Sequence, residues 1–272
     1  AGDGPGLRLV DSESASGFLQ PGTYFLSGFT STSLGDTQAA AVSSYTMSLT
    51  VSAAPENNPD VQEIFWRTPT SGSFEDEGNW SPDDVPDGND SAIFNKAGNY
   101  TVDVGLQQNN RVEVSRGRVT FSNPLYTANA LSTELASLRV NGNGRLTFSD
   151  GGMSVRHVIL GDIDTVGPPR DGTLAILGGV GLIGDGLMRI GAVGRGILLL
   201  GNGGDCTSAT TSIGSFESGS IATITGDGSE WTTGNLTMTG SLPKLTIENG
   251  ASVTSGEVVA DATSSLFAGA IR

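Results

Sequence analysis

The most constraining feature of this chain is a strand-and-glycine pattern that occurs three times. Its copies are residues 146–152, 198–204 and 245–251, which begin 52 and 47 residues apart. A strand-like triplet precedes each copy, at 138–140, 188–190 and 236–238. Imperfect repetition of strand, glycine turn and strand is typical of a chain that winds into a solenoid.

The composition agrees with many short strands joined by tight turns. The 272 residues include 40 glycines, about twice the usual share, and 16% of them are charged. Further strand-like pieces recur about every ten residues after residue 105, and we find no helical period there. We therefore predict an all-β protein in which residues 105–272 form a parallel β-helix. With coils of roughly 25 to 30 residues, this stretch holds about six coils.

Residues 1–55 are typical of β-sandwich strands. Residues 45–51 alternate strictly, with Tyr45, Met47, Leu49 and Val51 on one face. Residues 22–29 and 7–10 are two further strand-like segments, and three strands are too few to close a sandwich. We expect either that this partial β-sandwich is truncated or that another chain completes it, which would make the N-terminal β segment a route to self-association. Residues 56–63, rich in Asn and Pro, read as a linker.

Residues 64–104 carry a set of aromatic residues in a recognisable order. Trp66, Phe74, an Asn79-Trp80 pair and the run Asp90–Phe94 form an "NW…P…D-A-x-F" segment. This resembles the segment that opens β-helical regions in many large exported bacterial proteins, although Phe74 stands where Trp is usual. The open first coil of a solenoid needs a cover. We therefore expect residues 64–104 to act as an aromatic cap.

A second resemblance covers residues 225–251. Residues 225–231 read T-G-x-G-S-x-W, and two short strands that each begin with Leu follow, the second leading into N-G-A. This pattern is similar to the repeats of autotransporter passengers. The resemblance implies a right-handed parallel β-helix in a protein that is extracellular or on the bacterial cell surface.

Charge narrows the classes of partner. Acidic residues outnumber basic ones by 29 to 14, giving a formal net charge of −15. Nucleic acids and anionic membranes both attract basic surfaces, so we expect neither as a partner. No apolar run is long enough to insert into a membrane. Cys206 is the only cysteine, and we expect it to be a small buried core residue.

Catalytic chemistry has few candidates. His157 is the only histidine and lies within a strand, so we expect it to be structural. Cleavage of polysaccharides needs paired carboxylates. The acidic residues that could form such a pair are identified only by their position in the sequence. Most of them lie in glycine turns, where the backbone favours Asp. They are Asp150, Asp162, Asp164, Asp185, Asp205 and Glu217. We expect no enzymatic activity.

The densest acidic segment is 81–90. Oxygen ligands in a loop suit Ca²⁺, and the candidate ligands there are Asp83, Asp84, Asp87, Asn89 and Asp90. The spacing does not match an EF-hand. The alternative is a solvated turn in which Asp90 caps backbone amides. Beyond this possible Ca²⁺, we expect no cofactor.

The sequence thus predicts a non-enzymatic extracellular structural or adhesive protein, acting as a surface stalk or a filament-forming subunit. The alternative is a carbohydrate-active β-helix that binds or cleaves polysaccharide, with extracellular glycans as its partners. Few aromatic residues in the helical region are available for sugar stacking, which favours the first interpretation.

Overall fold

The computed structural model describes residues 62–128, 137–161, 170–178, 181–214 and 219–268. The chain divides into two compact units, 1–52 and 53–272. The described residues belong to the second unit, so the sandwich predicted for 1–55 and most of the linker at 56–63 lie outside them. The predicted fold class is confirmed for the second unit, an all-β parallel solenoid of about eight turns.

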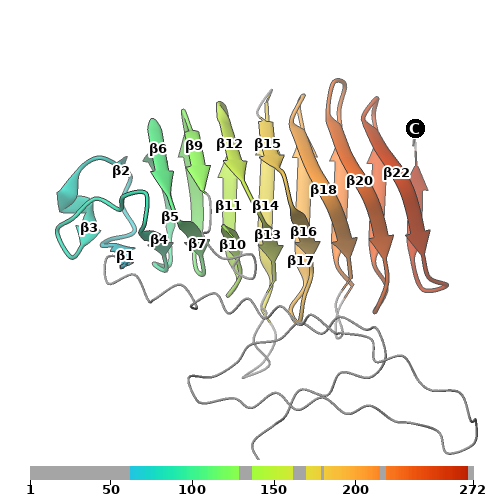
Figure 1. The fold of residues 1–272 in the computed structure, drawn as a ribbon, viewed down its shortest axis with the longest axis horizontal. Coiled ribbons are helices and arrows are strands. Elements are labelled where there is room, and N and C mark those ends of the chain that lie inside the picture. Colours follow the sequence, from blue (N-terminus) through green and yellow to red (C-terminus); the bar gives the residue numbers. More distant parts are fainter. Residues whose placement is uncertain (1–61, 129–136, 162–169, 179–180, 215–218, 269–272) are drawn as a thin grey trace, which may run out of the picture. The chain divides into compact units, whose positions relative to one another are not determined.

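The coils build two sheets, seen as stacked arrows in Figure 1. The nine-stranded sheet, here sheet B, takes one strand from each turn, and every neighbouring pair in it is parallel. Its strands are β2 (Gly72–Ser73), β5 (Asn99–Asp103), β8 (Arg118–Ser122), β11 (Gly144–Phe148), β14 (Gly172–Leu177), β17 (Gly196–Gly201), β19 (Ile221–Thr225), β21 (Lys244–Glu248) and β23 (Ser265–Ala268).

The fourteen-stranded sheet, sheet A, begins as two separate rows. One row contains β3 (Trp80–Ser81), β1 (Glu63–Trp66), β4 (Ser91–Phe94), β7 (Arg111–Val114), β10 (Leu138–Val140), β13 (Val158–Leu160) and β16 (Leu187–Ile190). The other contains β6 (Leu106–Asn109), β9 (Leu125–Ala128), β12 (Gly152–Val155) and β15 (Gly181–Gly184). In sheet A only β3 pairs antiparallel, with β1. The one helix among the described residues is the short 3-10 helix η1 (Glu77–Asn79).

The two rows of sheet A merge at β18 (Asp205–Ile213). Its first half pairs with β15 and its second half with β16, and β20 (Glu230–Met238) and β22 (Ser252–Ala260) continue this long bent form. The bend brings neighbouring strands very close, because a Cβ added at Gly234 would lie 2.3 Å from the carbonyl oxygen of Ala209. The coil changes from three strands per turn to two at β18, which has Ala209 at this position, and Gly234 allows β20 to stack closely on that bend.

The repeats found in the sequence lie in register within this coil. Leu146, Leu198 and Leu245 occupy one column of sheet B, with Leu174 and Ala222 between them. All five side chains are buried. The offsets of 52 and 47 residues therefore each span two coils. The shared turns have a common cause, because Gly151, Gly203 and Gly250 all have positive φ, a conformation that glycine adopts without strain.

The parallel ladders begin before residue 105. β1 pairs with β4, and β5 with β8, so the 64–104 segment contributes strands to the coil. This is why the turns number about eight, whereas six were predicted for 105–272. The side chains of Trp66, Phe74, Trp80 and Phe94 are fully buried there. Trp80 contacts the other three, with ring centroids 4.7 to 5.5 Å apart.

The last described strands leave core-facing side chains exposed. Val258 continues the column of the buried Leu236, and Leu266 continues that of Leu245, yet they are 38% and 44% exposed. No described residue packs over them from a further coil. Among the described residues, no helix has the length and apolar character needed to cross a membrane.

We predict that the core column, rather than strand propensity, stabilises each coil. Leu198→Ala, in the buried column, should lower the free energy of unfolding by about 3 kcal/mol, because truncating a buried leucine leaves a cavity. Leu199→Ala is the matched control, since Leu199 is the next residue of β17 and lies half-buried on the outer face. Denaturant unfolding of both variants tests this. Equal losses would contradict the assignment of faces.

Candidate functional site

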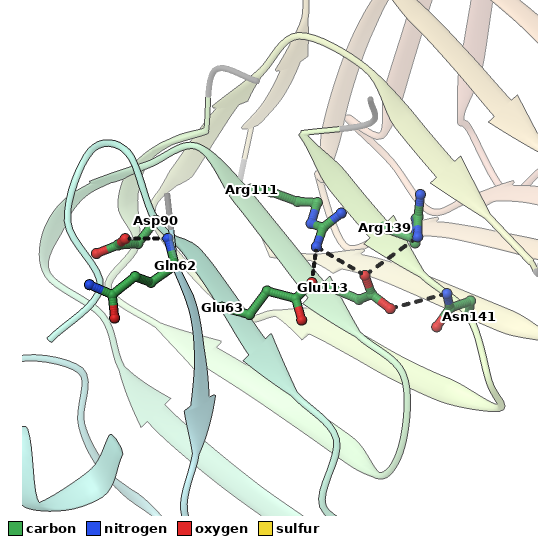
Figure 2. Close-up of polar contacts among 7 residues, drawn as sticks. All are labelled: Gln62, Glu63, Asp90, Arg111, Glu113, Arg139 and Asn141. Atoms are coloured by element: carbon green, nitrogen blue, oxygen red, sulfur yellow. Dashed lines mark hydrogen bonds and ion pairs between the residues drawn. The ribbon is translucent and has the colours of Figure 1, made fainter. Parts of the chain in front are cut away.

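The predicted calcium loop is organised around the buried Asp90. Its carboxylate accepts the backbone N–H of Gln62 and that of Asp87, each at 3.0 Å. The bond to Gln62 is drawn in Figure 2. The carboxylate of Asp87 accepts the N–H of Asn89 at 2.8 Å, and its carbonyl accepts the side-chain amide of Asn109. Asp90 thus ties the start of β1 to the loop before β4.

The other acids of this loop point to different partners. Asp83 forms an ion pair with Arg67, and Asp84 is exposed. Within the described ranges, no three His, Cys, Asp or Glu side chains are grouped so as to hold a metal ion. Backbone caps and one ion pair account for the contacts of this loop, and calcium binding stays a prediction that calorimetric titration with Ca²⁺ can test.

His157 has a structural contact in the turn before β13. Its Nδ1 accepts the backbone N–H of Leu187 at 3.0 Å, which links one coil to the next. The following turn passes so close that a Cβ on Gly186 would lie 2.5 Å from the imidazole. Burial, assisted by the charge of Arg156, lowers the pKa of His157, while Asp185 opposes this in part. The neutral ring is the form that can accept this bond.

We predict that His157 makes stability depend on pH. Because its pKa is lower in the folded chain than the unperturbed value of about 6.5, the unfolded chain binds the proton more tightly. The contribution is therefore present above about pH 6.5 and lost as the pH falls below it. His157→Asn, whose amide oxygen accepts a bond without titrating, is the matched control. On acidification to about pH 5, the melting temperature of the native chain should fall further than that of the variant; equal falls would refute the role.

Of the remaining predicted residues that the structure describes, only Asp205 and Cys206 are neighbours, and no group of three forms. Cys206 is buried in β18, as expected, and burial raises the pKa of its thiol. Asp150 is exposed and accepts the N–H of Asn123 at 2.7 Å, while Asp185 and Asp205 are exposed in later coils. Asp162, Asp164 and Glu217 lie outside the described residues.

A charged ladder crosses the outer face of sheet A near its start (Figure 2). Arg111 pairs with Glu63 at 2.8 Å and approaches Glu113 at 3.9 Å. Glu113 in turn lies 3.6 Å from Arg139 and accepts the amide of Asn141 at 3.3 Å. The side chains of Arg111, Glu113 and Arg139 are only 14 to 15% exposed, and each of them lies beside an opposite charge.

The outer face of sheet B carries a different arrangement. An open recess of about 330 Å³ lies over β5, β8 and β11. Its lining residues are Ser71, Asn99, Tyr100, Thr101, Arg118, Thr120, Arg145 and Thr147, of which only Tyr100 is buried in the core. Arg118 is exposed and Arg145 half-buried, and neither forms an ion pair with a carboxylate of the described residues.

The recess lies next to a step in sheet B, where β2 is shorter than its neighbours. β2 pairs only with Val102 and Asp103, the last residues of β5. The rest of β5 lies beside the chain that precedes β2, and there the hydroxyl of Ser71 accepts the N–H of Thr101 at 2.9 Å. Asn99, the first residue of β5, is exposed there and is the register partner of Arg118.

Sequence reasoning missed these residues, although a signal was present. Residues 117–122 read G-R-V-T-F-S and residues 144–149 read G-R-L-T-F-S, one coil apart. The structure sets the two copies in register, with Arg118 beside Arg145 and Thr120 beside Thr147. Repetition of the outward residues, as well as the core residues, was the sign that this face is distinctive.

No protein-family model, curated protein or solved structure matches this chain.

Proposed function

We propose that this chain is a non-enzymatic structural or adhesive protein, a rigid stalk or filament-forming subunit outside the cell or on a bacterial surface. The observation that carries the proposal is the continuity of the coil. From β4 to β23, every strand is hydrogen-bonded in parallel to the neighbouring coil, over a single apolar core. Bending such a stack would strain the ladders of both sheets together, which favours a role that needs stiffness.

The sequence supports a location outside the cell. Residues 225–251 resemble the repeats of autotransporter passengers, and these residues lie in consecutive coils, from the end of β19 to the turn before β22. Relationship to such passengers is part of the proposal, as is the role of the aromatic cluster of Trp66, Phe74 and Trp80 as a cap. The clustering of these rings at the first turn supports the cap.

Self-association through the N-terminal β segment is the second part of the proposal. We predict that the full chain forms concentration-dependent assemblies, and that Leu49→Asp abolishes them, because the charge would fall on the apolar face of residues 45–51. Ser48→Asp, on the opposite face, is the control and should assemble normally. Sedimentation and electron microscopy of the three proteins test this. A native chain that stays monomeric at high concentration would contradict self-association.

The enzymatic alternative is separable by one assay. Incubation of the chain with acidic polysaccharides should release no new reducing ends if the role is structural. Release of reducing ends would favour the carbohydrate-active alternative. Binding of a polysaccharide without cleavage needs no catalytic site, and the recess on sheet B is a candidate site for such binding.

A further inference from the structure

The recess on sheet B holds two like charges side by side. Arg118 and Arg145 are register partners on adjacent parallel strands, which run about 4.8 Å apart. Like charges directly opposite each other destabilise a sheet. Among the residues that the structure describes, the one polar contact of either side chain is a 3.4 Å bond from Arg145 Nε to the hydroxyl of Thr147. Nothing in the described sheet offsets this repulsion.

Elsewhere in the same chain, arginine side chains lie beside acidic side chains that offset their charge. On sheet A, Glu113 lies between Arg111 and Arg139, and on the turn before β17 Arg195 pairs with Asp171 at 2.6 Å. With twice as many acidic as basic residues, an acid opposite Arg118 or Arg145 would be easy to supply. An arrangement that violates a local rule without internal compensation points to a functional site.

The chemical groups that line the recess determine which class of ligand could bind there. Two guanidinium groups present planar forks of N–H donors that match carboxylate or sulfate oxygens. Around them stand the hydroxyls of Thr101, Thr120 and Thr147. These groups both donate and accept hydrogen bonds, which suits the hydroxyls of a sugar. The recess is thus suited to a ligand that carries acid groups among many hydroxyls.

Other ligand classes fit less well. Nucleic acid carries a charge at every phosphate and is attracted to extended basic surfaces, whereas this chain has a net charge of −15 and here only two arginines. Tyr100 is the one aromatic residue that lines the recess, and it is only 4% exposed, while Phe121 and Phe148 on the same strands are fully buried, so these strands offer no exposed ring that could stack on a neutral sugar. An extended chain can lie across an open recess, so a polymer is favoured over a small metabolite.

We propose that this recess is a binding site for an acidic polysaccharide, whose carboxylate or sulfate groups are held between Arg118 and Arg145. The threonine hydroxyls and Asn99 bind the sugar hydroxyls beside the acid group. This binding role goes beyond the structural role proposed above, and it requires neither assembly nor a catalytic step. The acid group of the ligand supplies the negative charge that the sheet lacks.

Calorimetric titration of the full chain at low ionic strength tests the site. The probes are polygalacturonate for carboxylate, dextran sulfate for sulfate and unmodified dextran as the neutral control. Binding to one or both acidic polymers and not to dextran is expected, and the polymer preferred identifies the acid group. Absence of binding to both acidic polymers would overturn the proposal.

Variants then locate the binding. Arg118→Gln and Arg145→Gln should each weaken affinity about 10-fold or more, since each removes a hydrogen bond to a charged group. Arg189→Gln is the matched control, because Arg189 is exposed on the outer face of β16, away from the recess, and forms no ion pair within the described ranges. If Arg189→Gln weakened binding equally, attraction would be non-specific and the site refuted.

Thermal melting separates binding from a structural role. Because the two arginines repel, Arg118→Gln and Arg145→Gln should melt at the same temperature as the native chain or higher. Arg111→Gln, which breaks the ladder of sheet A, should melt lower. A marked fall in melting temperature for the recess variants would show that the arginines are structural and contradict the proposal. Arg118→Lys, which keeps the charge but lacks the fork, should still weaken binding.

Discussion

The structure depends on the parallel ladder of backbone hydrogen bonds in which each coil pairs with the next. Because strands pair in register, a residue that faces the core in one coil sets the environment of its counterpart in the next. The column of Leu146, Leu174 and Leu198 is the clearest case, since like side chains stack on like over consecutive turns. A shift of one residue in any strand would turn its apolar residues to solvent, so the core fixes the register of the coil.

The same constraint explains where the coil departs from regularity. Where the two rows of sheet A merge, the polypeptide turns a corner inside one strand. The corner is stabilised by hydroxyls inside the coil: Ser208 bonds Thr211 at 2.8 Å, and Thr211 bonds Thr233 in the next coil at 3.1 Å. Buried hydroxyls that partner one another avoid the cost of unpaired polar groups. Polar residues therefore stack in register there, as apolar residues do elsewhere.

Outward-facing positions are free of the core constraint, and they are where the faces of the coil differ. On sheet A the outer charges alternate in sign, as with Glu113 and Arg139. On sheet B the charges of Arg118 and Arg145 reinforce each other over a recess. The charges on sheet A neutralise one another, whereas the two arginines on sheet B need an anionic ligand to neutralise them. The proposed roles follow this division, with rigidity supplied by the core columns and recognition by one outer face.

Much of the fold was predictable from the sequence, because alternation and glycine turns are local signals. The column through Leu198 and Leu245 was found as a repeat whose offset covers two coils, because the intervening strand with Ala222 matches its neighbours poorly. Other features were not predictable. From the sequence, Asp90 could either bind a metal ion or cap backbone amides. The sequence pattern of a carboxylate beside a turn is the same in both cases. The step beside the recess, at the short strand β2, is seen only in the three-dimensional register.

The most direct test of the account is the distance between spin labels placed along one outer column of sheet B. In a Cys206→Ala background, labels at Thr101 and Thr223 are separated by five strand steps, and labels at Thr101 and Thr246 by six. Pulsed electron paramagnetic resonance should give backbone separations of about 24 Å and about 29 Å, one strand spacing apart. Distances that fail to increase from Thr223 to Thr246 would contradict the in-register parallel coil.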